Sequence, residues 1–194
     1  MKVLMLNGSR REKGCTYTAL SEVASALEKE GIESEIFFVG EQAVKGDIDS
    51  LVKTIKEKME KSDGLVVGSP VYFAGPTAEI KAVLDRLFMG DGSFLKLKPA
   101  AAVASARRGG TTATLDVLNK YFSYAQMPIV SSRYWNMVHG STPEDVEQDT
   151  EGLQIIRVLG KNMAWLLKCI EAGKNNGIPA PEAEDKIFTN FIKK

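Results

Sequence analysis

The chain has 194 residues, of which 44% are hydrophobic and 26% charged, proportions typical of one soluble globular domain. Its 25 lysines and arginines balance 25 aspartates and glutamates, so no charge bias favours nucleic acid or a membrane surface as a partner. Cys15, Cys169 and His139 are its only cysteines and histidine, which excludes a disulfide framework and leaves a zinc cluster short of ligands. No apolar run reaches the ~20 residues of a membrane span, and no export signal is visible. We therefore expect a cytoplasmic protein.

Apolar runs of strand length alternate with segments of helical periodicity. Strands are expected at 3–6, 33–39, 65–67, 100–104 and from 128 to 134, and helices at 16–30, 51–61, 78–87, 111–125 and 150–172. A short helix is expected to begin at Thr142-Pro143-Glu144-Asp145, where a cap residue precedes a proline and two acids. The alternation predicts an α/β fold: a flavodoxin-like, doubly wound, five-stranded parallel sheet of order 2-1-3-4-5 with helices on both faces.

Three segments divide the chain. Residues 1–174 are expected to form one ligand-binding domain, in which 131–152 is longer than a simple connection and holds Tyr134, Trp135 and His139. This segment is interpreted either as a lid over the ligand or as a surface hairpin. The tail, 175–194, carries an apolar stripe (Ile187, Phe188, Phe191 and Ile192). We expect the stripe to dock either on its own domain or on a second subunit.

Ligands of such sheets bind beyond the carboxyl ends of the strands, so the loops after strands 1, 3 and 4 form the candidate site. The first loop, 7–16, supplies hydroxyls, cations and helix N-terminal amides that suit a phosphate. Its candidate residues are Ser9, Arg10, Arg11, Cys15 and Thr16. The alternative is that its hydroxyls are turn and cap residues and its arginines are solvated. The glycine-rich patterns of nucleoside triphosphate and dinucleotide loops are missing.

Two other functions of such sheets are excluded by single positions. A phosphotyrosine phosphatase needs an arginine six residues after its cysteine, and Ser21 stands six after Cys15. A phospho-accepting receiver needs an aspartate after strand 3, where Gly68-Ser69 stands. Cys15 is interpreted as a small residue in a crowded loop, with a pKa that the helix N-terminus would lower.

The second and third loops suit a planar, electron-accepting ring. The second offers Pro70, Val71, Tyr72 and Phe73, whose aromatic rings either form a wall for stacking or only anchor the loop. The third offers Ser105, Arg107, Arg108, Gly109 and Gly110. Its backbone N–H groups and cations would stabilise negative charge on a bound heterocycle.

Together these loops resemble a known family. Gly8-Ser9-x-Arg11-x-x-Gly14-x-Thr16, Gly68-Ser69-Pro70-Val71-Tyr72 and Leu84-Asp85-Arg86 are similar to the NAD(P)H-dependent FMN reductase group of the flavodoxin superfamily, above all its iron–sulfur flavoprotein branch. The resemblance implies that the first loop holds the FMN phosphate, that Pro70 to Phe73 line the ring, and that Ser105 to Gly110 meet its pyrimidine edge. It also implies a homodimer or homotetramer.

Three departures accompany the resemblance. Arg10 stands where proline is common, Cys15 stands where an asparagine is usual, and no compact cysteine cluster exists. Without that cluster an iron–sulfur centre cannot be ligated. The expected function is an FMN-dependent oxidoreductase that takes hydride from NADH or NADPH and reduces a small acceptor, such as a quinone, a flavin or a metal. The alternatives are a flavodoxin-like electron carrier and an FMN-free binding domain.

Overall fold

The computed structural model describes residues 1–90, 92–185, 187–189 and 191–192. Its strands are β1 (Lys2–Asn7), β2 (Glu33–Phe38), β3 (Gly64–Pro70), β4 (Ala100–Ala106) and β5 (Met137–His139). Its helices are α1 (Cys15–Lys29), α2 (Gln42–Lys45), α3 (Ile48–Glu60), α4 (Ala78–Met89), the 3-10 turn η1 (Gly92–Phe94), α5 (Thr111–Tyr124), α6 (Pro143–Gln148) and α7 (Thr150–Asn175). The strands form one parallel sheet in the order β2-β1-β3-β4-β5, which confirms the predicted topology.

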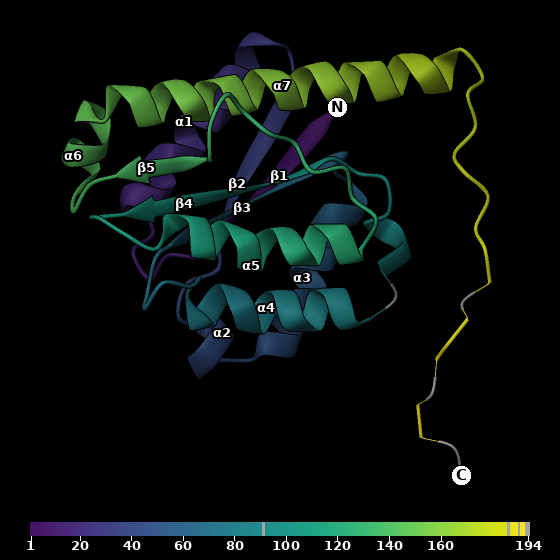
Figure 1. Ribbon diagram of the computed structural model, residues 1–194, viewed down its shortest axis with the longest axis horizontal. Coiled ribbons are helices and arrows are strands. Elements are labelled where there is room, and N and C mark those ends of the chain that lie inside the picture. The colour runs from purple at the N-terminus through teal and green to yellow at the C-terminus, as the bar shows by residue number, and fades with distance from the viewer. Residues whose placement is uncertain (91, 186, 190, 193–194) are drawn as a thin grey trace.

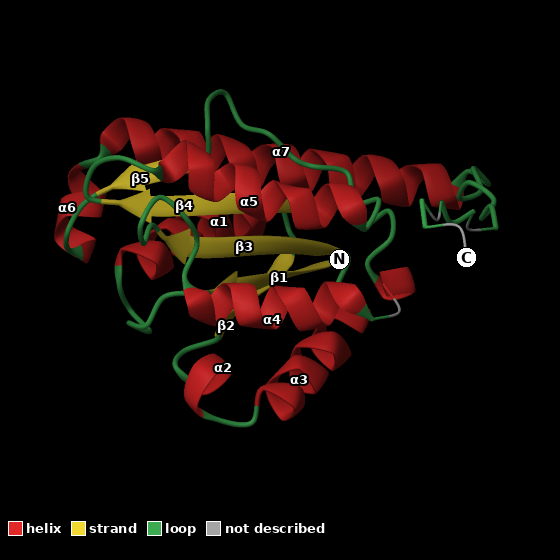
Figure 2. Ribbon diagram, turned by 60° about the horizontal axis from the view of Figure 1, so that its bottom comes forward, coloured by secondary structure: helices red, strands yellow, loops and turns green. Residues whose placement is uncertain are grey.

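Both faces of the sheet are covered by helices (Figures 1 and 2). Successive strand side chains point to opposite faces, so Val3 and Met5 pack with α1, α6 and α7, whereas Leu4 and Leu6 pack with α2, α3, α4 and α5. All four side chains are fully buried. The double burial explains why the strands appear in the sequence as continuous apolar runs.

The fifth strand was predicted too early in the chain. Residues 128–130 meet β4 only at its beginning, where the Val130 amide donates to the Ala100 carbonyl (2.8 Å) and Ile129 forms an isolated bridge. The chain then leaves the sheet. The Ser132 hydroxyl donates to the Tyr134 carbonyl and accepts from the Tyr134 amide, so the backbone of Tyr134 bonds Ser132 and not a neighbouring strand. It returns where Asn136 accepts from the Ala104 amide (2.9 Å), and β5 follows.

The 131–152 segment is largely built into the fold. It contains β5 and α6, and α6 begins with the expected cap: Thr142 and Asp145 form a reciprocal capping box, with Pro143 in the first turn. The short helix α2, between β2 and α3, was not expected from the sequence. α7 runs three residues beyond the predicted end, and its carboxyl end is closed by Gly177, whose φ is 79°.

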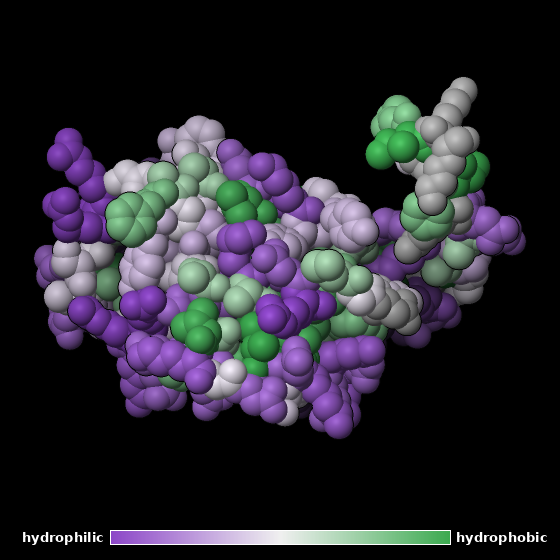
Figure 3. Space-filling model, turned by 90° about the horizontal axis from the view of Figure 1, so that it is seen from below, coloured by the Kyte–Doolittle hydropathy of each residue, from purple (hydrophilic) through white to green (hydrophobic). Residues whose placement is uncertain are grey.

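The tail leaves the body of the molecule after α7 (Figure 1). Its described apolar side chains are exposed, among them Ile187, Phe188 and Phe191. Figure 3 shows apolar (green) atoms of the tail at the upper right, apart from the body, whose visible face is mostly polar with small apolar patches. Within the described ranges, no helix combines the length and apolar composition that crossing a membrane requires.

Candidate functional site

The second and third loops pack closely at the carboxyl edge of the sheet, and a buried hydroxyl pair joins the first to the third. Thr16 on α1 and Ser105 on β4 share a hydrogen bond of 2.8 Å between their hydroxyl oxygens. A Cβ placed on Gly110 would lie 2.8 Å from Val71 Cγ1, and Gly110 has a φ of 95°. Glycine is thus required where the third loop touches the second.

The first and second loops also lie in direct contact. The Gly8 amide donates to the Gly68 carbonyl (2.9 Å), and the Thr77 hydroxyl donates to the Gly8 carbonyl (2.7 Å). A Cβ on Gly8 would lie 2.6 Å from Ile80 Cβ, so a larger residue would push the loop away from α4. The structure therefore brings the three predicted loops together.

Two helix N-termini at these loops lack side-chain caps. α1 begins after Gly14 and α5 after Gly110, and neither receives a cap hydrogen bond from a side chain. By contrast, Asp47, Thr77 and Asp149 cap α3, α4 and α7. The first-turn amides of α1 and α5 therefore remain available to an acceptor from outside the chain, and both helix dipoles favour negative charge there.

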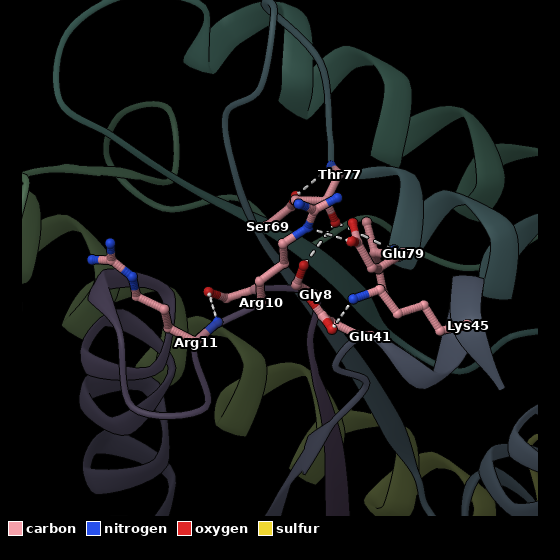
Figure 4. A network of polar contacts seen from close by, with 10 residues as sticks. Gly8, Arg10, Arg11, Glu41, Lys45, Ser69, Thr77 and Glu79 are labelled. Atoms are coloured by element: carbon pink, nitrogen blue, oxygen red, sulfur yellow. Dashed lines mark hydrogen bonds and ion pairs between the residues drawn. The ribbon is translucent and has the colours of Figure 1, made fainter.

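Ser9 and Arg11 shape the first loop. Ser9 is buried, its amide donates to Asn7 Oδ1 (3.1 Å), and its hydroxyl oxygen accepts from the Arg11 amide (3.0 Å). The Arg11 side chain is exposed and forms no ion pair with any residue that the structure describes. It extends away from Arg10 (Figure 4). The loop thus presents one arginine beside the N-terminus of α1.

Cys15 and Thr16 have less freedom than expected. The Thr16 hydroxyl is buried against Ser105. The Cys15 thiol is half-buried and donates to the Gly140 carbonyl (3.7 Å). Burial raises the pKa of Cys15, which corrects the expectation that the helix N-terminus lowers it: desolvation of the thiolate outweighs the helix.

Arg10 has a partner that the sequence did not reveal. Its Nε donates to Glu79 Oε1 at 2.5 Å, and its guanidinium carbon lies 6.0 Å from the centroid of the Tyr72 ring. The hydrogen bond to Glu79 raises the pKa of Arg10. Nothing in the sequence marks Glu79 as buried, because an acidic residue in the first turn of a helix is ordinary.

The second loop ends in a tight turn. The Tyr72 amide donates to the Gly75 carbonyl (2.9 Å) and the Gly75 amide to the Tyr72 carbonyl (3.0 Å). Phe73 and Ala74, between them, have φ values of 50° and 58°. Pro70 and Val71 are half-buried, Tyr72 is partly exposed, and Phe73 is fully exposed. The turn therefore holds two aromatic side chains at the site.

In the third loop, Ser105 is buried and Gly110 is half-buried, whereas Arg107, Arg108 and Gly109 are exposed. Both arginines are therefore accessible to a ligand at this edge.

Tyr134 and Trp135 lie outside the three loops. They precede β5 and lie near the middle of β4, where the Asn136 side chain donates to the Ala102 carbonyl (3.1 Å). Their rings meet edge to face, with centroids 4.6 Å apart. A fifth strand at 128–134 would put them at its carboxyl end, on the ligand side; that expectation is wrong, because β5 begins only at Met137. His139, at the end of β5, pairs with Ala106 beside the third loop.

Among the described residues, no three His, Cys, Asp or Glu side chains gather into a group that could hold a metal ion.

Curated relatives include an iron–sulfur flavoprotein of Methanocaldococcus jannaschii, 31% identical over 196 residues, with 88% of this chain and 100% of the relative covered. Another is the NADPH-dependent FMN reductase of Escherichia coli, 29% identical over 153 residues, with 75% and 74% covered.

Solved structures share the fold. RosB, solved with 8-demethyl-8-formylriboflavin-5'-phosphate, has a TM-score of 0.68 at 16% identity and covers 100% of this chain and 94% of its own. A WrbA-like flavodoxin of Agrobacterium tumefaciens has a TM-score of 0.65 at 15% identity, with 87% and 97% covered. The model of the NADPH-dependent FMN reductase family matches residues 1–142. On this match and on the 31% identical relative, the chain belongs to the NADPH-dependent FMN reductase family.

Proposed function

We propose that the chain binds FMN across its three loops, takes hydride from NADPH or NADH, and passes electrons to a small-molecule acceptor in the cytoplasm. The observation that carries the proposal is the pair of uncapped helices, α1 and α5, which begin at the same edge of the sheet, one on each face, at the loops of an FMN reductase family member. Amides that bind no side chain of their own suit a phosphate and an electron-rich ring edge.

The first loop would hold the FMN phosphate. The exposed Arg11 supplies a charge-assisted hydrogen bond, and the amides of Cys15 and Thr16 open α1 without a competing cap. Ser9 orients this loop through the Arg11 amide. The Thr16 hydroxyl, engaged by Ser105, would have to turn from that partner to reach the phosphate.

The second and third loops would hold the ring. Pro70 to Phe73 would form one wall of the ring site, with Tyr72 at its exposed edge. The first-turn amides of α5, together with Arg107 and Arg108, would face the pyrimidine edge and stabilise the negative charge of the reduced ring. FMN itself supplies hydride acceptance and electron release, so the chain needs no acid–base pair.

An iron–sulfur centre has no place in this proposal. The relatives bear that name, but this chain has only two cysteines, one in the first loop and one on α7. Electrons would therefore leave FMN directly for a small acceptor, and we expect no stoichiometric iron or acid-labile sulfide in protein prepared anaerobically.

An absorption spectrum of the purified protein, before and after anaerobic NADPH, tests the proposal. We expect an oxidised flavin spectrum that NADPH bleaches. Bleaching by dithionite but not by NADPH or NADH would contradict the reductase activity and favour an electron carrier. A colourless protein that takes up no added FMN would contradict the flavin site and favour an FMN-free binding domain.

A further inference from the structure

Glu79 is a buried carboxylate whose charge is compensated from across the site. Its side chain, in the first turn of α4, is fully buried. Arg10 Nε binds Oε1 at 2.5 Å, and Oε2 has no hydrogen-bond partner among the described residues. A buried carboxylate that loses its cation is strongly destabilising. Glu79 therefore anchors the Arg10 guanidinium, although the rest of the Arg10 side chain is half-exposed.

The same guanidinium lies beside an aromatic ring. The Arg10 guanidinium carbon is 6.0 Å from the Tyr72 ring centroid, at the outer range of a cation–π contact. The backbone of Tyr72 is fixed by its two hydrogen bonds to Gly75. Glu79, Arg10 and Tyr72 thus form a chain of contacts from the start of α4 to the edge of the second loop.

The two arginines of the first loop point in different directions. Figure 4 shows the Arg10 side chain reaching toward Glu79 and Thr77, while Arg11 extends to the opposite side. Arg11 lies at the uncapped N-terminus of α1, where the proposed function places the phosphate: its Cβ is 3.2 Å from a Cβ built on Gly14, which precedes the helix.

We propose that Arg10, fixed by Glu79, is a positioning residue that holds Tyr72 as a wall of the isoalloxazine site and is not a ligand of the FMN phosphate. The inference rests on the proposed FMN site and reassigns one of its expected phosphate-binding residues. It predicts that Arg10 affects the binding of every ligand with the flavin ring, whether or not that ligand carries a phosphate.

Riboflavin separates the two roles, because it has the ring and ribityl chain of FMN without the phosphate. The test variant is the double substitution Arg10→Gln with Glu79→Gln, which leaves no buried charge without its partner. Its dissociation constants for FMN and riboflavin are measured by fluorescence titration of flavin-free protein. We expect both constants to rise by the same factor, roughly 2–5-fold, because a Tyr72 ring that has lost its cation–π contact must be ordered when a flavin binds, at a cost no larger than that contact was worth.

A second variant shows whether the effect passes through the ring. In a Tyr72→Leu background, the double substitution should change neither constant, because the group that Arg10 positions is gone. The control is Arg157→Gln with Glu22→Gln, which removes an ion pair of the same 2.5 Å Nε geometry between α7 and α1. The control should leave both constants unchanged.

Weaker FMN binding with unchanged riboflavin binding would make Arg10 a phosphate ligand and overturn the inference. Unchanged binding of both flavins, or an undiminished effect in the Tyr72→Leu background, would overturn it as well. If the unaltered protein binds neither flavin, the proposed function fails first, and the inference fails with it.

Discussion

Arg10 and Arg11 are neighbours in the chain but lie in different surroundings. Both are exposed, but Arg10 is bound by the buried carboxylate of Glu79, whereas Arg11 lies beside the start of α1 and forms no ion pair with the described residues. The backbone separates them, because the turn made by Ser9 sends consecutive side chains to opposite sides of the loop. Adjacent cations in one motif can therefore serve different parts of a ligand.

Replacing Arg11 by alanine should weaken FMN binding by about 1.5–3 kcal/mol, or roughly 10–150-fold, because a charge-assisted hydrogen bond to the phosphate is lost. Riboflavin binding should not change. Fluorescence titration of both flavins measures the effect, with Arg86→Ala on the outer surface of α4 as the control. Unchanged FMN affinity would move the phosphate away from the first loop.

The sequence predicted which loops meet at the site but not the contacts among their side chains. The three loops follow from strand order alone, because parallel strands end at one edge. The Arg10–Glu79 contact joins residues 69 positions apart, and nothing local marks Glu79 as buried. The raised pKa of Cys15 was likewise unpredictable, since it comes from burial of the thiol, which lies against Gly140, 125 positions away.

Among the elements, those with strong local signals were predicted correctly. α6 was found because its capping box is written in four consecutive residues. The fifth strand was misplaced because Pro128 to Val130 have strand-like composition, yet they pair only with the first residue of β4. α2 was missed because one turn of helix gives too short a periodicity to detect.

The turn at Phe73 and Ala74 carries conformational strain. Both residues have left-handed φ values, which cost roughly 1–2 kcal/mol for residues other than glycine. Ala74→Gly should therefore raise the free energy of unfolding by about 0.5–1 kcal/mol in denaturant melts. The matched control is Ala172→Gly in α7, which should lower it by a similar amount. A lower stability of the Ala74 variant would contradict the strain.

Glu35 ties three elements together. On β2, it accepts from Lys2 of β1 (2.7 Å) and Lys58 of α3 (2.6 Å), and these hydrogen bonds lower the pKa of Glu35. A lowered pKa stabilises the folded state above the ordinary glutamate pKa, about 4.3, and the benefit is lost as the pH falls through the lowered value.

Glu35→Gln should therefore lower the free energy of unfolding by about 0.5–1 kcal/mol at pH 7, the upper range for partly exposed pairs. The difference from the unaltered protein should shrink as the pH falls below about 4. Urea melts across this pH range measure the difference. The control is Glu41→Gln, which removes the exposed ion pair between Glu41 and Lys45. A difference that persists in acid would show that packing, not charge, is responsible.

At the scale of the whole molecule, the tail is the feature that the rest of the chain does not explain. Its described apolar side chains are exposed, with Ile187, Phe188 and Phe191 each at least 84% accessible. Apolar groups in that state usually mark an interaction surface. We therefore retain the prediction of a homodimer or homotetramer, with the tail or the 131–152 segment at the interface.

Removing the residues after Gly177 should lower the oligomer order or the melting temperature, because the deletion removes the apolar stripe that the interface would bury. Sedimentation velocity at micromolar concentration measures the first, and a thermal melt the second. The full-length variant Phe188→Ser with Phe191→Ser should reproduce the effect without shortening the chain. A monomeric full-length protein would instead mean that the tail packs on its own domain.

Three exposed phenylalanines, Phe73, Phe188 and Phe191, should be cut at different rates in limited proteolysis. Phe73 is as accessible as Phe188 and Phe191, but it sits in a hydrogen-bonded turn, whereas the two tail residues lie outside helices and strands. A protease needs several residues of locally unfolded chain, so accessibility alone does not set the rate. Chymotrypsin should therefore cut the tail first and Phe73 much later. The ratio of the two cleavage rates would then report how often the second loop opens, and added FMN should slow only the later cut.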